Sequence, residues 1–552
     1  MHLLQHFKEL TLRPKNAQEL KGVILQLAIQ GKLTTTWRKE NPNTDSATVL
    51  LKKIKETNTT NLGFTRRNKT GEKIAVLNLP SSWIQIQNFE LFSLKKGKNP
   101  KDLAESVKKY PYQDIEALDR GNVRRYSDDE KAPRCTNDDI LVVCDGSRSG
   151  LLLDGKTGIV GSTLAVIKTP EFIKPYIKII FLQDYQRANK NMIGAAIPHL
   201  DTKNLLNETI GLPPLEEQKA IVQVVENLFK EVEKLEQLTI ARISLKEKFV
   251  VSTLNQLTTN HTKKEWTFLQ EHFHTFFNEK NNIKKLRETV LQLAVQGKLT
   301  ADWRINNSDI EDASILLKRI QKEKEQLIKD KKIKKETPLP GIAKNEIPYE
   351  VPEDWVWCRF QEVFDIRDGT HDSPKSISGP NSYPLVTSKD FKNGEIDFES
   401  AKRISKEDYN KIIQRSLVEE DDILFSMIGG NLGNQVMVKG TTDFAIKNVA
   451  LFKYYNKSLS IPDFLKTFSE HIAYAVQEKA SGGAQPFISL TFLRQMLIPF
   501  PPLEEQKAIV AKVNALMGLC NALEKEVKQS QEQSEKLMQS VLREVFETNN
   551  AL

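Results

Sequence analysis

The sequence has few cysteines, no long apolar run and no signal peptide, the features typical of zinc-binding, membrane and secreted proteins. Its 552 residues include four cysteines, Cys135, Cys144, Cys358 and Cys520. Their number and spacing fit neither a zinc site nor a disulfide framework. No apolar run approaches the roughly 20 residues of a transmembrane helix, and the N-terminus lacks the apolar core and cleavage site of a signal peptide. We therefore expect a cytoplasmic protein with no membrane span and no metal site.

Catalytic motifs are also scarce. The eight histidines are scattered, and there is no H-E-x-x-H, no glycine-rich cofactor loop after a strand and no Asn-Pro-Pro-aromatic tetrapeptide. Residues 150–157 match the phosphate-binding pattern G-x-x-x-x-G-K-[ST]. That motif requires a following helix, whereas the strand-like segment 163–167 comes next. A nucleotide hydrolase using Lys156 is thus the weaker alternative, and we expect no catalytic residue in this chain.

The composition fits a soluble globular protein, with 39% hydrophobic and 28% charged residues. The length allows three to five units of ordinary domain size. The net charge of +8 is compatible with a polyanionic partner, but many basic proteins bind no nucleic acid.

What the sequence does contain is an internal duplication. The decapeptide Pro213–Val222 returns unchanged at Pro501–Val510, 288 positions later, and Leu25–Thr34 returns almost unchanged at Leu291–Thr300, 266 positions later. Each decapeptide has the proline and the two carboxylates that favour a helix start. Within the segment at 25–34, Gly31 is a plausible C-terminal cap of a helix. The helices repeat closely while the regions between them diverge.

Apolar residues follow each decapeptide at alternating spacings of four and three, the pattern of a coiled-coil seam. The first seam is Ile221, Val225, Leu228, Val232 and Leu235, and the second is Ile509, Val513, Leu516, Cys520, Leu523 and Val527. In the same frame the first seam weakens at Thr239, Arg242 and Lys246, whereas the second resumes at Leu537 and Val541. Because two equivalent helices lie in one chain, we favour an intramolecular antiparallel coiled coil over dimerisation.

The order of the parts predicts an α+β protein with a cyclic pseudo-two-fold repeat. We expect a helical segment at 1–40, a linker at 41–75, a globular region at 76–212, a central helical region at 213–304, a second linker at 305–346, a second globular region at 347–500 and a C-terminal helix at 501–552. The stretch 321–336 is rich in Lys and Glu, which predicts a solvated helix face or, alternatively, a phosphate-contacting arm. The chain termini should lie near each other, with the globular regions at opposite ends of a helical spacer.

Polar, glycine-containing loops with basic residues stand beside predicted strands in both globular regions. Arg, Asn and Gln can pair with base edges, while Lys, Ser and Thr suit phosphate oxygens. The predicted DNA-binding residues are Lys95, Lys96, Lys98, Arg120, Arg124, Arg125, Ser147 and Arg148 in the first region, and Arg367, Thr370, His371, Lys375, Lys389, Asn431, Asn434 and Gln435 in the second.

A globular region that ends in Leu-Pro-Pro-Leu-Glu-Glu-Gln and leads into a long helix, twice in one chain, resembles the specificity subunits of type I restriction–modification systems. The most specific marks are Leu212–Val222 and Phe500–Val510; Arg367–Lys375, Tyr383–Asp390, Asp145–Ser147, Ile197–Leu200 and Gln485–Ser489 also look like family segments. The leading helix at 20–38 looks like the cyclically arranged members.

The resemblance implies that the globular regions are target recognition domains, each reading one half of a bipartite, asymmetric DNA site across a coiled-coil spacer. It implies two modification subunits that bring S-adenosylmethionine and methylate adenine, and two motor-nuclease subunits that use ATP and Mg. No cofactor is expected in this chain. A coiled-coil scaffold that binds DNA without sequence preference remains the other alternative.

Overall fold

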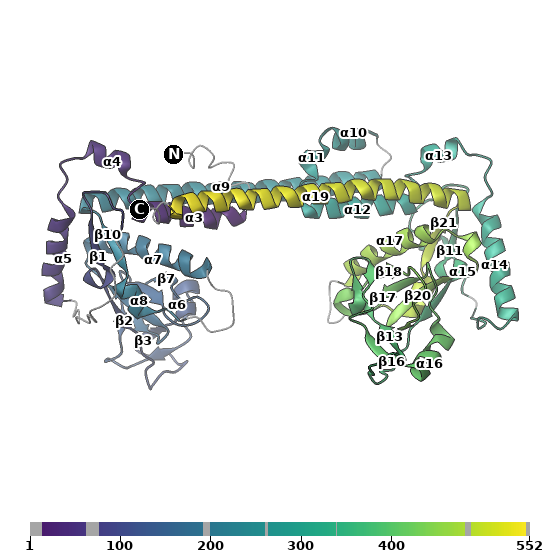
Figure 1. Ribbon diagram of the computed structural model, residues 1–552, viewed down its shortest axis with the longest axis horizontal. Helices are drawn as coiled ribbons and strands as arrows, with labels where there is room; N and C mark the ends of the chain where they lie inside the picture. The colour runs from purple at the N-terminus through teal and green to yellow at the C-terminus, as the bar shows by residue number, and fades with distance from the viewer. Residues whose placement is uncertain are drawn as a thin grey trace. The chain divides into compact units, whose positions relative to one another are not determined.

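A computed structural model describes residues 14–61, 77–190, 199–259, 263–337, 339–480 and 487–547. The chain forms two compact units (Figure 1): unit 1 is residues 1–244 with 531–552, and unit 2 is residues 245–530. We call their globular parts head 1 (residues 76–212) and head 2 (residues 347–500). The prediction that the termini meet concerns residues 1–13 and 548–552, which lie outside the described residues.

Head 1 contains two four-stranded sheets. The first has the order β2-β9-β6-β7 and is antiparallel throughout, with β2 Ser93–Lys96, β9 Leu164–Lys168, β6 Ile140–Val143 and β7 Leu152–Asp154. The second has the order β4-β3-β8-β5, with β4 Tyr126–Ser127, β3 Tyr110–Gln113, β8 Gly158–Val160 and β5 Arg134–Cys135. Its helices are α6 Ile115–Arg120, α7 Lys174–Lys190 and α8 Thr202–Asn207.

Head 2 repeats the first of these sheets strand for strand. The order is β12-β20-β17-β18, with β12 Phe364–Asp368, β20 Val449–Tyr454, β17 Ile423–Ser426 and β18 Gln435–Met437. A three-stranded sheet β16-β13-β19 (Lys402–Ser405, Ser382–Val386, Ala445–Ile446) and the hairpin β14–β15 (Phe391–Lys392, Glu395–Ile396) lie beside it. The helices are α15 Phe360–Val363, α16 Lys406–Ser416, α17 Pro462–Ala480 and α18 Leu490–Gln495.

In the central strands, successive apolar side chains alternate between two hydrophobic clusters, one on each face of the sheet, which explains why these sheets form. In β6, Ile140 and Val142 belong to the hydrophobic cluster under α7, while Leu141 and Val143 belong to a second cluster on the opposite face. The strand β17 divides its residues in the same way. Because successive side chains of a strand point to opposite faces, both central strands are buried on two sides.

The chain enters and leaves each head through one short pair of strands. In head 1, β1 (Ile84–Gln87) pairs antiparallel with β10 (Thr209–Leu212), and in head 2, β11 (Val356–Arg359) pairs with β21 (Leu497–Phe500). Long helices follow directly: α9 spans Leu215–Thr259 and α19 spans Leu503–Glu547, 45 residues each. Each unit holds the beginning of one long helix and the end of the other, as antiparallel helices require.

The repeated helix at 25–34 also lies where it can join the head to the long helix. Helix α3 (Pro14–Ile29) packs against α7 in unit 1, and its counterpart α12 (Lys280–Val295) packs against α17 in unit 2 (Figure 1). The seam residues Ile221, Val225 and Val232 share one core with α3 and head 1. The second seam, from Ile509 to Val527, shares one with α12, head 2 and the last turns of α9.

The distal half of α9 differs from the predicted seam. We expected the frame to run through Arg242 and Lys246 to Phe249, but Phe249 is 39% exposed and Val250 and Leu254 are buried instead. A straight helix repeats every 3.6 residues rather than 3.5, so its buried face moves one position over several turns. The same drift leaves Leu537 of α19 52% exposed. The side chain of Val541 is outside the described set.

Both predicted linkers contain a helix. Helix α5 (Ala47–Asn61) lies in 41–75, and α14 (Ala313–Lys329) lies in 305–346 and ends before the predicted Glu336. Each buries residues at helical spacing: Ala47, Leu50 and Ile54 in α5, and Ala313, Leu316 and Ile320 in α14. These six positions repeat at the offset of 266, so the two segments belong to the duplicated part rather than to linkers. Unit 2 also has the short helices α10 (Lys263–Glu271) and α11 (Phe273–Phe276).

Each unit has one fully buried carboxylate, Glu217 in unit 1 and Glu505 in unit 2, at the centre of an equivalent hydrogen-bond cluster. Glu217 accepts hydrogen bonds from Thr34 Oγ1 (2.7 Å), Trp83 Nε1 (2.9 Å) and Arg38. We call Thr34, Arg38, Trp83 and Glu217 the Glu217 cluster. Its counterpart, the Glu505 cluster, consists of Thr300, Arg304, Trp355 and Glu505 with the same bonds.

Each cluster is approached by a glycine that ends the preceding helix. Gly31 and Gly297 both have φ +68°, and a Cβ on either would lie 2.7 Å from a proline Cγ of the head. Only glycine fits this left-handed, crowded position without strain. The arginine of helix α4 (Thr35–Glu40) donates to the Gly31 carbonyl at 2.6 Å; Arg304 lies in the equivalent helix α13 (Ala301–Ile305). The long helix, the repeated helix and the head are therefore joined at one point in each unit.

Candidate nucleic-acid interface

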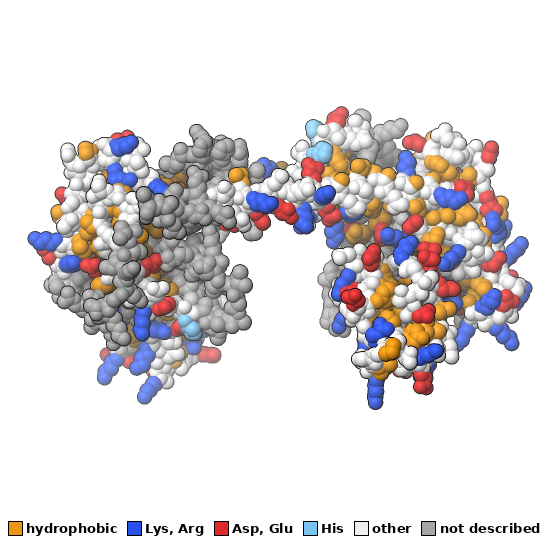
Figure 2. Space-filling model, in the orientation of Figure 1, with side chains coloured by type: hydrophobic (Ala, Val, Ile, Leu, Met, Phe, Trp, Pro, Cys, Tyr) orange, Lys and Arg blue, Asp and Glu red, His pale blue; other side chains and the backbone are white. Residues whose placement is uncertain are grey.

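In head 1 the predicted basic residues lie on β2, on α6 and on the segment after α6. Lys95, Lys96 and Lys98 are exposed at the end of β2 and beyond it. Arg120 is the last residue of α6 and is exposed. Figure 2 shows lysine and arginine side chains protruding from the end of each head that is remote from its long helices. The side chains of Lys95, Lys96, Lys98 and Arg120 are thus exposed to solvent.

Three of the arginines are paired with carboxylates of α6 or its N-cap. Arg148 Nη1 lies 2.9 Å from Asp119, Arg124 lies 2.6 Å from Glu116 and Arg125 lies 2.9 Å from Asp114. The hydrogen bond from Arg148 lowers the pKa of Asp119 below its ordinary value. Exposed pairs of this kind contribute about 1 kcal/mol or less to stability. Their effect is to hold the guanidinium groups in defined directions.

Ser147 and Arg148 lie in the loop between β6 and β7, next to Asp145 and its partners His199 and Lys96. Asp145 accepts from His199 Nδ1 at 2.9 Å and pairs with Lys96 Nζ at 3.1 Å. These contacts, with His199 the larger influence, lower the pKa of Asp145. The structure thus brings Lys96 beside the loop of Ser147 and Arg148, from which it stands far apart in the sequence.

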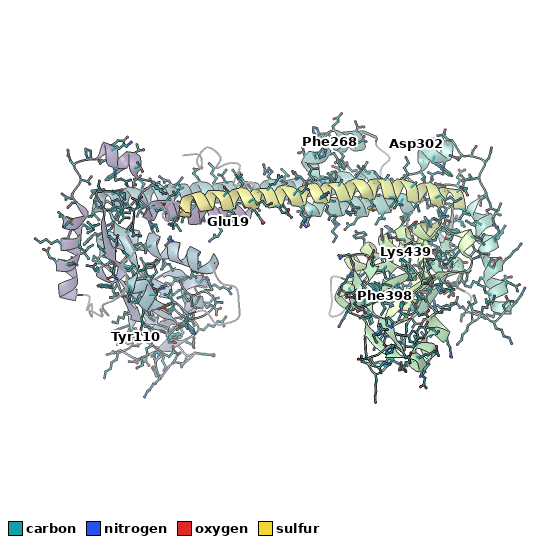
Figure 3. All side chains as sticks on the ribbon, viewed as in Figure 1. Glu19, Tyr110, Phe268, Asp302, Phe398 and Lys439 are labelled. Atoms are coloured by element: carbon teal, nitrogen blue, oxygen red, sulfur yellow. The ribbon has the colours of Figure 1, made fainter. Side chains whose placement is uncertain are left out.

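Sequence reasoning missed an aromatic group in head 1. Tyr110, labelled in Figure 3, has Lys109 and Arg134 over its ring at 5.3 and 4.7 Å, and Arg125 lies 4.7 Å from the ring of Tyr112. Cations placed over aromatic rings are held by the ring quadrupole. The alternation of Tyr110 and Tyr112 along β3, next to basic residues, was the available signal.

In head 2 the residues predicted around 367–375 separate into two groups. Arg367 is tied to Asp365 through Nε at 2.8 Å and Nη2 at 2.6 Å, and its side chain is only 24% exposed. It is therefore committed to packing within the head. Thr370 uses its backbone to join β19 and its Oγ1 to accept from Asp372 at 3.1 Å. Lys375 is exposed.

His371 is exposed but held from two sides. Its Nε2 lies 3.2 Å from Asp368 and its Nδ1 lies 3.0 Å from the side-chain oxygen of Asn448, a residue with φ +56°. Asp368 also pairs with Arg415. Asn448 and Arg415 were absent from the predicted set because both come from other segments of the chain.

The remaining predicted residues of head 2 lie around the loop between β17 and β18. Asn431 donates to the carbonyl of Ser388 at 3.5 Å, which brings it beside the exposed Lys389. Asn434 is exposed, whereas Gln435 is in β18 with a buried Oε1. Head 2 thus presents Lys389, Asn431 and Asn434 together and turns Gln435 inward.

The formal phosphate-binding match has the wrong geometry. Residues 150–157 run through β7 into a turn before β8, so a strand and not a helix follows Lys156. Lys156 Nζ donates to the carbonyl of Ala117 at 3.3 Å. A phosphate-binding loop of this kind requires a helix directly after its lysine, and here β8 takes that place.

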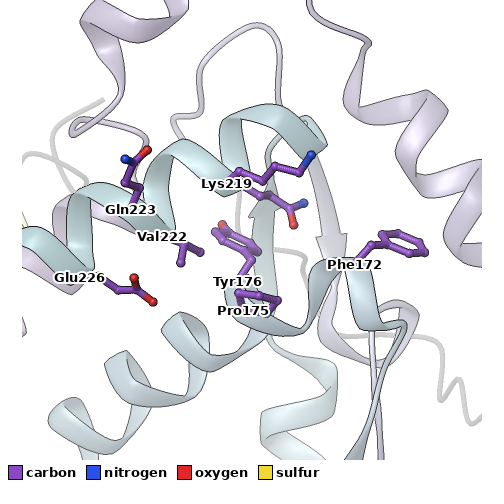
Figure 4. A pocket seen from close by; sticks show the side chains of 8 residues that line it. Phe172, Pro175, Tyr176, Lys219, Val222, Gln223 and Glu226 are labelled. Carbon is purple, nitrogen blue, oxygen red and sulfur yellow. The ribbon is translucent and has the colours of Figure 1, made fainter. Parts of the chain in front are cut away.

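Other ligand sites are not evident in the described parts. No group of three His, Cys, Asp or Glu side chains there is placed to hold a metal ion. A small pocket in unit 1 lies between Pro175 and Tyr176 of α7 and Val222 of α9 (Figure 4). It is formed where the two helices pack. Among the helices that the structure describes, none is long and apolar enough to cross a bilayer.

Comparison with known proteins places these heads in one family. Residues 80–245 and 352–533 match the family model for the type I restriction modification DNA specificity domain. Together the two matches cover more than half of the chain and fall on the two heads with the start of each long helix.

Individual relatives are similar over nearly their whole length. The EcoAI specificity subunit of Escherichia coli is 27% identical, over 93% of this chain and 92% of that protein. The EcoEI specificity subunit of the same organism is 24% identical, over 93% and 91%. A solved structure of the HsdS subunit from Thermoanaerobacter tengcongensis is 18% identical and covers 85% of this chain and 97% of its own, with a TM-score of 0.37.

Proposed function

The chain belongs to the family of type I restriction–modification DNA specificity subunits, which are non-catalytic, and from that premise we propose that it reads a bipartite, asymmetric DNA site. Each head recognises one half-site. The long helices α9 and α19 form the spacer that sets the gap between the half-sites.

One observation supports this proposal above the others. The two heads have the same central sheet, strand for strand, but different side chains at its exposed loops. A common frame with different exposed groups is what two readers of different sequences need, since phosphate contacts position a protein and base-edge contacts specify the site. The half-sites should therefore differ.

The other subunits of the system supply the chemistry. We propose two modification subunits, which bind S-adenosylmethionine and methylate adenine after extruding it from the duplex, and two motor-nuclease subunits, which use ATP and Mg. This chain scaffolds them and contributes recognition alone.

A binding selection from random duplexes tests the recognition. The full chain with its partner subunits should recover two short motifs separated by a fixed gap. Recovery of sequences without a two-part motif would instead favour a scaffold with sequence-independent phosphate contacts. Mapping of methylated adenines in DNA from cells that carry the chain and its partners would locate the same site independently.

The spacer has its own test. Insertion of four residues between Val232 and Leu238 lengthens α9 by about 6 Å, since each helical residue adds about 1.5 Å. The gap should change while both half-site sequences stay the same. The matched control is a four-residue insertion after Gly341, where no atom lies within 4 Å of an added Cβ; it should leave the gap unaltered. Changed half-sites with an unchanged gap would refute the spacer.

A further inference from the structure

The loops β6–β7 and β17–β18 form the same turn in the two heads, although their sequences differ. The first is Gly146-Ser147-Arg148-Ser149-Gly150 and the second is Gly429-Gly430-Asn431-Leu432-Gly433, at an offset of 283. The outer glycines all have positive φ, +110° and +88° in the first turn and +68° and +81° in the second. Only glycine adopts such angles readily, so the backbone path is set by these four residues.

The hydrogen bonds of the two turns also correspond. In head 1, Ser149 N donates to Gly146 O and Gly150 N to Val143 O, at 3.0 and 2.7 Å. In head 2, Leu432 N donates to Gly429 O and Gly433 N to Ser426 O, at 3.0 and 2.9 Å. Every bond joins equivalent positions, which means that the backbone frame is the same.

Each turn packs against a helix of its own head, the first turn against α7 and the second against α17. A Cβ on Gly150 would lie 3.3 Å from the ring of Tyr185 in α7, and one on Gly433 would lie 3.0 Å from Ala473 in α17. The fourth residue of each turn, Ser149 or Leu432, is buried. Three of the five residues in each turn are thus constrained by φ or by burial. The two at the tip, residues 147–148 and 430–431, are not buried.

Residues 199–200, after α7, and residues 487–488, after α17, lie alongside the two turns in the same way. Leu200 N donates to Cys144 O at 2.8 Å, and Ile488 N donates to Met427 O at 2.9 Å. These bonds place His199 beside the first turn and Phe487 beside the second. Both side chains are largely exposed, Phe487 at 63% and His199 at 68%.

On this shared frame the exposed side chains differ in chemistry. The tip of the first turn carries Ser147 and Arg148, with His199 alongside. The tip of the second carries Gly430 and Asn431, with the apolar Phe487 alongside. Asp119 orients Arg148 at 2.9 Å, and the Ser388 carbonyl lies 3.5 Å from the Asn431 amide nitrogen.

We propose that positions 148 and 431 are equivalent specificity-determining positions, at which Arg148 reads a guanine and Asn431 reads an adenine. This inference rests on the proposed function, since it assumes that each head reads one half-site. Asp119 is the positioning residue for Arg148. Phe487 contacts the methyl group of a thymine in the same half-site as Asn431.

The chemistry of the two side chains leads to this assignment. A guanidinium donates two parallel hydrogen bonds to O6 and N7 of guanine, and a carboxamide both donates to and accepts from the edge of adenine. Asp119 occupies Nη1 of Arg148 and leaves Nη2 and Nε available, so it restrains the plane without using all the donors. An aromatic side chain suits the thymine methyl group.

The test is a binding selection with the full chain and its partners, comparing wild type with R148N and N431R. Each substitution gives one turn the tip residue of the other. R148N should lower the preference for guanine over other bases at one position of one half-site by about 10- to 100-fold, the range expected for one bidentate contact. N431R should do the same for adenine in the other half-site. The second half-site and the gap should be unchanged in each case.

The matched control is R124N. Arg124 is also exposed in head 1 and also pairs with an α6 carboxylate, Glu116, but it lies outside the turn. It should weaken binding evenly across sequences. A folded R148N protein with wild-type preferences in both half-sites, or an R124N protein with the same base change as R148N, would overturn the inference. Failure of the wild type to give a two-part motif would instead refute the proposed function.

The role of Asp119 is tested by D119N and D119E. D119N should lower the guanine preference at the Arg148 position by a factor of about 3 to 10, within the range of a weakened charged contact, and D119E should restore part of it. Thermal stability should be unchanged, because the pair is exposed. Equal guanine preference in D119N and wild type would show that Asp119 does not position Arg148.

Discussion

Head 1 and head 2 share their central sheet and differ in what surrounds it. The order β2-β9-β6-β7 equals β12-β20-β17-β18, and α7 and α17 cover the same face. Outside this sheet, head 2 adds the hairpin β14–β15 and the longer helix α16, whereas head 1 has β5 and α6. The comparison shows that the part buried against the long helices is preserved, and that the part facing away from them is free to diverge.

The largest effect is expected at the buried carboxylates that join each head to its helices. Glu217→Ala leaves Arg38 and Trp83 without their buried partner, which should cost unit 1 about 3–5 kcal/mol. Glu505→Ala should do the same to unit 2. Hydrogen exchange measured separately for residues of the two units would show protection lost in one unit only.

The control for this experiment is the neighbouring residue. Glu216→Ala removes a carboxylate that is 55% exposed and paired with the exposed Lys219, so the change should stay within about 0.5 kcal/mol. Equal loss of protection in both units after Glu217→Ala, or an effect of Glu216→Ala as large, would mean that the cluster does not stabilise its own unit.

A smaller effect distinguishes the two units by pH. His471 in α17 occupies the position of Gln183 in α7, and burial lowers the pKa of His471 to about 4. The unfolded chain takes up a proton near pH 6.5 while the folded unit resists it, so this contribution is present above pH 6.5 and is lost as the pH falls towards 4. From pH 7 to pH 5, His471 alone should lower the unfolding free energy of unit 2 by about 1–2 kcal/mol.

The substitution His471→Gln makes unit 2 resemble unit 1 and should remove this loss. Asp422 acts in the opposite direction, because burial raises its pKa from 3.8 to about 6 although Lys453 donates to it at 2.5 Å. Its contribution to stability is complete below pH 3.8 and is lost as the pH rises through 6. The measurement is therefore the difference in unfolding free energy between wild type and His471→Gln at each pH. A difference that does not vary with pH would contradict the prediction.

The smallest effect concerns the ion pairs between the repeated helix and the long helix. Lys21 in α3 pairs with Glu233 at 2.7 Å, and the equivalent Arg287 in α12 contacts Asn521 at 2.6 Å and Glu524 at 2.8 Å. Lys21→Ala and Arg287→Ala should each cost at most about 1 kcal/mol, since one partner of each pair is half exposed. Arg287→Ala should cost more because Arg287 contacts Asn521, Glu524 and the sulfur of Met517, whereas Lys21 pairs with Glu233. Thermal unfolding of single mutants checks the order.

The sequence predicted the duplicated helices and the first half of each seam, because identical decapeptides and apolar spacing are visible in one dimension. It did not predict the Glu217 cluster, whose members Trp83 and Glu217 are 134 positions apart. The helix α5 was missed, and α14 was predicted only in part, as a helical stretch at 321–336. Their polar composition favoured linkers, although Ala47, Leu50 and Ile54 recur 266 positions later.

The candidate interface was predictable by residue type but not by direction. Ser147, Arg148 and Asn431 lie at exposed loop tips, as their glycine-rich surroundings suggested. Arg367 lies on the less buried face of β12, where it pairs with Asp365, and the sequence alone does not reveal such a partner. The correspondence of the two turns was hidden, because only their glycines agree and the offset of 283 differs from those of the helices.

The pairing of β1 with β10 and of β11 with β21 has a consequence for how such a chain can change over generations. Because the polypeptide enters and leaves each head through one pair of adjacent strands, residues gained or lost inside the head do not displace the helices outside it. The second head (residues 347–500) has 17 more residues than the first (residues 76–212), and the Glu217 and Glu505 clusters still have the same hydrogen bonds. Under the proposed function, a head that changes its DNA preference therefore leaves the long helix that follows it unaltered.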